Sequence, residues 1–191
     1  MMPSSADRLS DGQIAHIRSQ PLFFVATAAP TGRVNLSPKG MDTLRVLTPN
    51  RIVWLSLSGS GNETAAHLLE DSRMTLMFCA FEGKAGILRA YGTARAVYPG
   101  GRDWPNLSGL FPDMAGTRQI FDLTVDLVQT SCGTGVPVMR FERQRGPDEL
   151  LPFYDALGAD GVRAYWGRKN AVSLDGRPTG ISTNLRSDER I

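Results

Sequence analysis

The chain has 191 residues, of which 41% are hydrophobic, and it carries a formal net charge of +2. Its 21 basic and 19 acidic residues are interspersed. No Lys/Arg-rich block is present to follow phosphates, so we expect no nucleic-acid partner. We expect one domain over residues 1–191, large enough to bury a core without metals or disulfides.

The N-terminus is polar and lacks the apolar core of a signal peptide, and no apolar run approaches the length of a membrane span. These features predict a cytoplasmic protein with no membrane partner. Cys79 and Cys132 lie far apart and form no CxxC pair. Each has apolar or small neighbours, so we expect two reduced, buried thiols.

The first part of the chain alternates strand patterns with turn residues. Ser10 begins a short capped helix that ends before Pro21. Turn chemistry at residues 29–32 predicts a hairpin. The expected strands are 22–27, 33–37, 43–47 and 52–57.

The central part continues with a helix at 62–71 and with strands at 74–80, 85–97 and 121–129. In the last strand, hydrophobic residues at 121, 123, 125 and 127 alternate with others, which predicts one buried face. Many short strands with interposed helices and Gly/Pro turns favour a mostly β fold, an antiparallel barrel with peripheral helices.

After Gly146 the composition changes. We expect a helix from Pro147 to Leu157, ending before Gly158. The tail from Lys169 is polar and is expected to form a surface arm. Residues 147–191 are therefore interpreted as a C-terminal helix and arm of the same domain. Val172 and Leu174 alternate with polar residues, as if they were packed against a surface.

Two nearby segments have the composition of a phosphate-binding site. They are Asn35–Gly40 (NLSPKG) and Gly59–Thr64 (GSGNET), each next to an apolar run. A Gly/Ser loop that opens a helix presents free backbone N–H groups, which favour an anion. The lysine and hydroxyl groups add donors. Neither segment matches a Walker A or a Rossmann motif, and the plain alternative is that Asn62 caps a helix after a turn.

The order of FVATA, NLSPKG, a strand ending in Trp54, GSGNET, RMTLMF and ILRAYGTARAV resembles the pyridoxamine phosphate oxidase-like family. The segments QTSCGTGVPVMRFERQR and YWGRKNAVSLDGRP resemble one uncharacterised branch of it. The resemblance implies an FMN-binding split β-barrel and a homodimer with two flavins at its interface. It also implies hydride transfer between the flavin and a small-molecule substrate.

The resemblance further implies cofactor-binding residues. Ser37 and Lys39 match the segment near the flavin, and the alternative for Lys39 is a solvated turn residue. Asn62 and Thr64 match the family's GN-x-T pattern, where the phosphate or ribityl chain is expected. Glu63 departs from the basic residues of better-known members and would repel a phosphate if its carboxylate pointed inward.

Trp54 matches the strand whose backbone meets the isoalloxazine edge, although a core aromatic is the favoured interpretation. For Arg89 two interpretations are equally good: a side chain on the solvent face of its strand, or one that binds the phosphate. Cys132, Lys169 and Asn170 are candidate substrate contacts. The alternative for Cys132 is a structural cysteine, and the alternative for Lys169 and Asn170 is a frayed tail.

His16 and His67 have no partner at metal-ligand spacing, so we expect no metal site. No catalytic residue is assigned. This sequence lacks the RLHDR-like motif of vitamin B6 oxidases, which favours a different, unidentified substrate. The alternatives are a flavin- or haem-binding module without turnover, and a deazaflavin-dependent reductase on the same fold.

Overall fold

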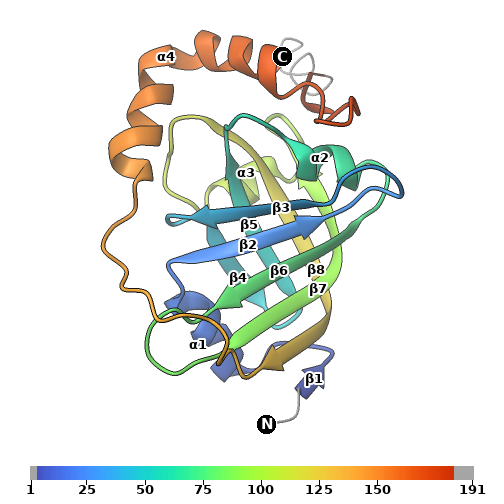
Figure 1. Ribbon diagram of the computed structural model, residues 1–191. Coiled ribbons are helices and arrows are strands. Elements are labelled where there is room, and N and C mark those ends of the chain that lie inside the picture. The colour runs from blue at the N-terminus through green and yellow to red at the C-terminus, as the bar shows by residue number, and fades with distance from the viewer. Residues whose placement is uncertain (1–3, 183–191) are drawn as a thin grey trace.

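The computed structural model describes residues 4–182. It is mostly β, with a curled antiparallel sheet and helices around it (Figure 1). The elements are β1 (Ser4–Ala6), α1 (Asp11–Ser19), β2 (Leu22–Thr27), β3 (Asn35–Gly40), β4 (Leu44–Thr48), β5 (Arg51–Leu57), α2 (Glu63–Leu68), β6 (Arg73–Cys79), β7 (Ile87–Val97), α3 (Trp104–Ser108), β8 (Thr117–Ser131) and α4 (Gly146–Lys169).

The sheet has eight strands in the order β3-β2-β6-β7-β8-β5-β4, and β1 also pairs with β8. All pairings are antiparallel. The sheet curls around its core and leaves β3 and β4 at its two ends (Figure 1). The expected mostly β fold with peripheral helices is confirmed.

The main core fills the inside of the curl. In β2, residues 23, 25 and 27 are buried and alternate with partly exposed ones, which is the period-two pattern of a strand with one buried face. Trp54 stacks on Phe121 with ring centroids 4.5 Å apart, and Phe23 stacks on Phe78 at 5.9 Å. Helix α1 begins with the predicted capping box, in which Ser10 and Gln13 bond each other's backbone N–H groups.

One predicted strand face is wrong because of a β-bulge. Tyr91 pairs with Leu127 but Gly92 pairs with Val125, so Asp126 is an extra residue in β8. The extra residue reverses the faces beyond it. Leu127 is 42% exposed, and Val128 is fully buried in its place. Gly92 permits the close approach, because a Cβ there would lie 1.9 Å from a β8 carbonyl oxygen.

Several predicted boundaries also change. Strand β3 covers residues 35–40, where 33–37 was expected, and Pro38 is tolerated there because β3 is an end strand of the sheet and pairs with β2. Helix α2 is six residues long, shorter than the expected 62–71. Cys79 is buried as expected, whereas Cys132 is exposed.

Helix α4 consists of two helical segments that meet at Gly158, whose φ of 63° and ψ of 176° are not helical. The first segment ends where the sequence predicts. The second, up to Lys169, was not predicted. Val172 and Leu174 are 57% and 75% exposed, so their side chains do not pack within this chain, and packing across a dimer stays a prediction. The predicted arm extends to residue 191, and its last part, 183–191, lies outside the described residues.

Candidate functional site

The two segments singled out in the sequence meet at one cavity. It has a volume of about 420 Å³ and lies between β3, β5, the loop before α2, β8 and the start of α4. Strand β3 contributes Asn35 and residues 37–40, and β5 contributes residues 54–57. The remaining lining residues are Met41, Thr43, Ser58, Gly59, Ser60, Gly61, Asn62, Glu63, Thr64, Arg118, Phe121 and Leu150.

Lys39 is directed into this cavity and is not a solvated turn residue. Its Nζ lies 5.6 Å from the centroid of the Trp54 ring, in a cation–π contact. Burial, and then the positive charge of Arg118, lower the pKa of Lys39 from 10.5 to about 8. Both causes act against the charged form, so the site holds a cation that an anion would stabilise.

Arg118 is the second cation, and the sequence analysis missed it. Only 4% of it is exposed. Its Nη1 donates to the Gly61 carbonyl oxygen at 2.9 Å and its Nη2 to Ser56 Oγ at 3.1 Å. Within residues 4–182 its Nε is buried without a hydrogen-bond partner. Burial lowers the pKa of Arg118 from 12.5 to about 10.

Neither cation has a carboxylate partner in the part of the chain that the structure describes, although Glu63 lies at the same cavity. Both carboxylate oxygens of Glu63 instead accept a hydrogen bond from the backbone N–H of Leu174. A buried guanidinium without a counter-ion is unfavourable, so the arrangement favours an anionic ligand.

Asn62 does not cap α2 with its side chain. Its amide oxygen accepts from Gln119 Nε2 at 2.6 Å, and the two amides are buried. This pair ties the loop before α2 to β8. Asn62 therefore occupies the N-cap position, as the plain alternative expects, but its side chain serves the contact with β8 and not the helix. Because α2 has only six residues, the two cations, and not the helix N-terminus, carry the case for an anion.

A buried polar network holds Thr64 at the cavity wall. Asn35 Nδ2 donates to Thr64 Oγ1 at 3.1 Å and to Thr27 Oγ1 at 3.2 Å. Thr27 Oγ1 also contacts Nδ1 of the buried His67 at 3.1 Å. Because the Thr64 oxygen accepts the Asn35 amide, the Thr64 hydroxyl proton is free to donate to a ligand.

Trp54 is a core aromatic, as the sequence favoured, and it also lines the cavity. Its Nε1 is buried without a partner among the described residues. Ser37 and Thr64 line the cavity as well. The roles of these residues in binding a cofactor stay predictions.

Four predicted site residues do not line the cavity: Arg89, Cys132, Lys169 and Asn170. Arg89 is on the outward-facing side of β7 and donates to Ser131 Oγ at 3.1 Å. Cys132 is exposed, and a hydrogen bond from Thr134 lowers the pKa of its thiol. Lys169 is exposed at the end of α4. Asn170, in contrast, is fully buried and donates to the Gly59 carbonyl oxygen at 2.8 Å, behind the cavity wall.

No histidine lines the cavity. Residues 4–182 contain no group of three His, Cys, Asp or Glu side chains placed to hold a metal ion. They also contain no helix with the length and apolar character needed to cross a membrane.

Comparison with known proteins gives one family model and one curated relative. The family model described as Pyridoxamine 5'-phosphate oxidase matches residues 11–132. The pyridoxamine 5'-phosphate oxidase family protein ustO of Aspergillus flavus is 32% identical over 206 residues, which cover 97% of this chain and 80% of that protein.

One solved structure supports the fold. A candidate pyridoxamine 5'-phosphate oxidase from Lactobacillus delbrueckii superimposes with a TM-score of 0.52 and 16% identity, over 67% of this chain and 98% of that one. A FAD-binding protein from Mesorhizobium loti gives a TM-score of 0.44 and 13% identity, over 68% of this chain and 97% of that one.

Proposed function

Because this chain belongs to the pyridoxamine 5'-phosphate oxidase family, we propose that it binds FMN in the cavity of Lys39 and Arg118. We further propose that it acts as a flavin-dependent oxidoreductase on a small molecule. The observation that carries the proposal is the pair of buried cations that line one cavity without a carboxylate partner in the described residues.

The residues present fit a flavin monophosphate. A phosphate monoester carries close to two negative charges at pH 7, which matches one lysine and one arginine. The same cavity is lined by Trp54, Phe121 and Leu150, which offer apolar contacts for a ring system.

In this proposal Lys39 and Arg118 bind the phosphate, and the hydroxyls of Ser37 and Thr64 complete its hydrogen bonds. Asn35 orients the Thr64 hydroxyl. Trp54 and Phe121 exclude water from the cavity by their packing. The bound flavin would supply the redox chemistry, as a carrier of hydride equivalents. This division of labour accounts for a site that needs no catalytic acid–base pair of its own.

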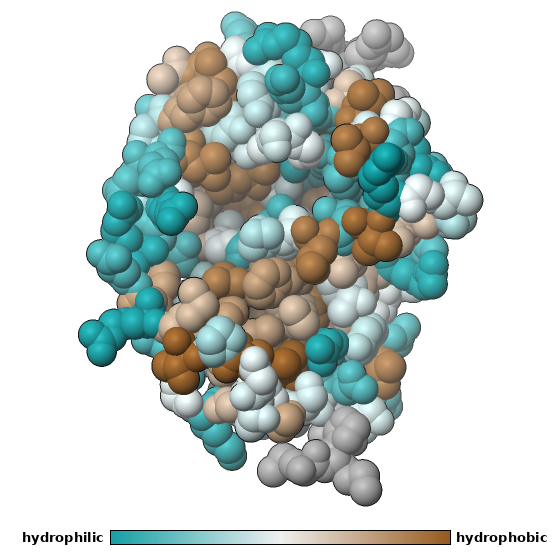
Figure 2. Space-filling view, in the orientation of Figure 1, coloured by the Kyte–Doolittle hydropathy of each residue, from teal (hydrophilic) through white to brown (hydrophobic). Residues whose placement is uncertain are grey.

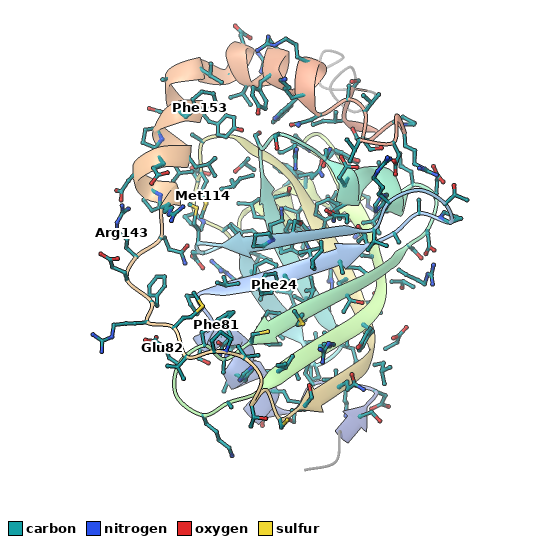
Figure 3. All side chains as sticks on the ribbon, in the orientation of Figure 1. Phe24, Phe81, Glu82, Met114, Arg143 and Phe153 are labelled. Carbon is teal, nitrogen blue, oxygen red and sulfur yellow. The ribbon has the colours of Figure 1, made fainter. Side chains whose placement is uncertain are left out.

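We also propose a homodimer, because the molecule exposes apolar surface that suits a partner. Val138, Met139 and Phe141, in the connection between β8 and α4, are 87%, 56% and 47% exposed. The backbone N–H of Met139 bonds Phe81, so this connection lies beside the end of β6. Figure 2 shows hydrophobic residues gathered on this face, and Phe24 and Phe81 lie on it in Figure 3. Such patches are typical of interfaces.

The test is the absorbance spectrum and mass of the small molecule that co-purifies with the protein, followed by titration with FMN. Flavin absorbance bands and the mass of FMN are the expected result. A Soret band would instead support a haem-binding module, and fluorescence gained only with a deazaflavin would support the deazaflavin reductase. Protein that binds no FMN would refute the proposal.

A further inference from the structure

The C-terminal arm, defined here as residues 170–182, folds back onto the wall of the cavity. Within it, the backbone N–H of Gly176 donates to the Ser173 carbonyl at 3.0 Å, which forms a tight turn with Leu174 and Asp175 at its centre. The upper right of Figure 1 shows this segment beside α2. The arm therefore presents a defined turn to the first residues of that helix.

The turn contacts the cavity through a single backbone group. The N–H of Leu174 donates to both carboxylate oxygens of Glu63, at 3.0 and 3.1 Å. Glu63 is the first residue of α2 and lines the cavity. The Leu174 side chain is 75% exposed, so the contact depends on its backbone.

Other contacts fix the turn in place. Asp175 accepts a hydrogen bond from the backbone N–H of Arg33 at 2.7 Å and pairs with the guanidinium of the same residue. Arg177 donates to Glu70 at 2.8 Å and to Thr31 at 2.7 Å. The arm is thus bound to the β2–β3 loop, to Glu63 at the start of α2 and to Glu70 just after its end.

Glu63 is the one carboxylate among the lining residues, and it shares the cavity with Lys39 and Arg118. A carboxylate free to turn toward the cavity would repel an anion and attract the two cations. The arm restrains this carboxylate, because the Leu174 N–H bonds both of its oxygens.

We propose that the arm is a specificity element: by holding the Glu63 carboxylate, the Leu174 backbone amide makes the cavity selective for a phosphate-bearing ligand over its uncharged counterpart. The inference rests on the proposed flavin site and names what controls the charge preference of that site. Glu63 is the residue through which the arm acts, and Leu174 positions it.

The experiment compares Leu174→Pro with Leu174→Ala. Proline removes the N–H and is well suited to the second position of a turn, whereas alanine keeps the N–H. Affinities for FMN, riboflavin and inorganic phosphate are measured by calorimetry. We expect Leu174→Pro to weaken FMN and phosphate by roughly tenfold, with riboflavin unchanged, as for one added repulsion at the cavity rim. Leu174→Ala should match the wild type.

Adding Glu63→Gln to Leu174→Pro should restore the FMN-to-riboflavin ratio, since the repelling charge is gone. A general collapse of the cavity would weaken both flavins and would not be rescued. An unchanged ratio in Leu174→Pro, or no rescue by Glu63→Gln, overturns the inference. If Leu174→Pro does not fold, Arg177→Ser, which releases the turn from Glu70 and Thr31, takes its place in the same comparison.

The measurements with inorganic phosphate separate this inference from the proposed function. Wild-type protein that binds phosphate but not FMN, with phosphate weakened in Leu174→Pro, refutes the flavin and supports the role of the arm. Wild-type protein that binds FMN with no change of ratio in the variant does the reverse. Wild-type protein that binds neither FMN nor phosphate refutes both.

Discussion

Replacing Arg118 by methionine should affect binding and folding very differently. Arg118 is buried, and its only hydrogen-bond acceptors in residues 4–182 are the Gly61 carbonyl and Ser56 Oγ. Methionine keeps a similar length and removes the charge. The ligand-free protein then loses an unneutralised buried cation, while the ligand loses a partner.

The magnitude follows from the pKa of Arg118. Its fall from 12.5 to about 10 corresponds to about 3 kcal/mol of destabilisation of the ligand-free fold. The sign is clear at pH 7: the pH lies below both pKa values, so the group is charged in the folded and unfolded states and the full penalty applies. Losing two hydrogen bonds costs about 1 kcal/mol each. The net gain in unfolding free energy is therefore small, at most about 1–2 kcal/mol.

For the ligand, loss of a charge-assisted contact to phosphate should cost about 1.5–3 kcal/mol, roughly ten- to a hundredfold in the FMN dissociation constant. Urea unfolding of the ligand-free protein and FMN titration measure the two effects. Arg95→Met is the matched control: Arg95 pairs with Asp103 and Asp122 outside the cavity, so it should lower stability and leave FMN affinity unchanged. An unchanged FMN affinity in Arg118→Met, or a loss of stability above about 3 kcal/mol, would refute the reasoning.

Four further results are expected. Lys39→Ala should weaken FMN by about ten- to a hundredfold without unfolding the protein, and an unchanged dissociation constant would remove Lys39 from the site. Since the pKa of Lys39 is lowered to about 8, its charge is lost as the pH rises through that value, so wild-type FMN affinity should fall between pH 7 and 9; calorimetry at stepped pH would show a flat profile if the lysine were not involved. FMN should bind at least as tightly as FAD, and competition titration favouring FAD would contradict the monophosphate site. Light scattering should find a dimer at micromolar concentration, and a stable FMN-bound monomer would count against the interface.

Much of the fold follows from local patterns. Alternation in residues 22–27, turn residues at 29–32 and the capping box at Ser10 each depend on neighbours in the sequence, and all are found as expected. The reversed face of β8 depends on one glycine in another strand, Gly92, which lets the bulge form. A single glycine in a strand pattern suggests a bulge without fixing which partner residue is extra.

The same dependence on local pattern explains why only part of the site was predicted. Lys39 and Thr64 belong to compact motifs, and both line the cavity. Arg118 belongs to no motif and precedes the expected strand at 121–129, so no local pattern placed it at the site. The arm was harder still, because its contacts join residues more than 100 positions apart, such as Leu174 with Glu63. Such pairings follow from the three-dimensional course of the chain and not from local pattern.

The second segment of α4 has a fixed rotation about its axis relative to the loop before α2. Trp166 donates to Ser58 Oγ at 2.6 Å, and Asn170 donates to the neighbouring Gly59 carbonyl. The two donors are four residues apart, so they share one side of the helix, and they reach consecutive residues of the same loop. One residue inserted between Gly158 and Trp166 would rotate both donors by about 100° and break both contacts at once. The same insertion ahead of Gly158 would leave the number of residues between Gly158 and the two donors unchanged, so the two contacts fix the length of this segment.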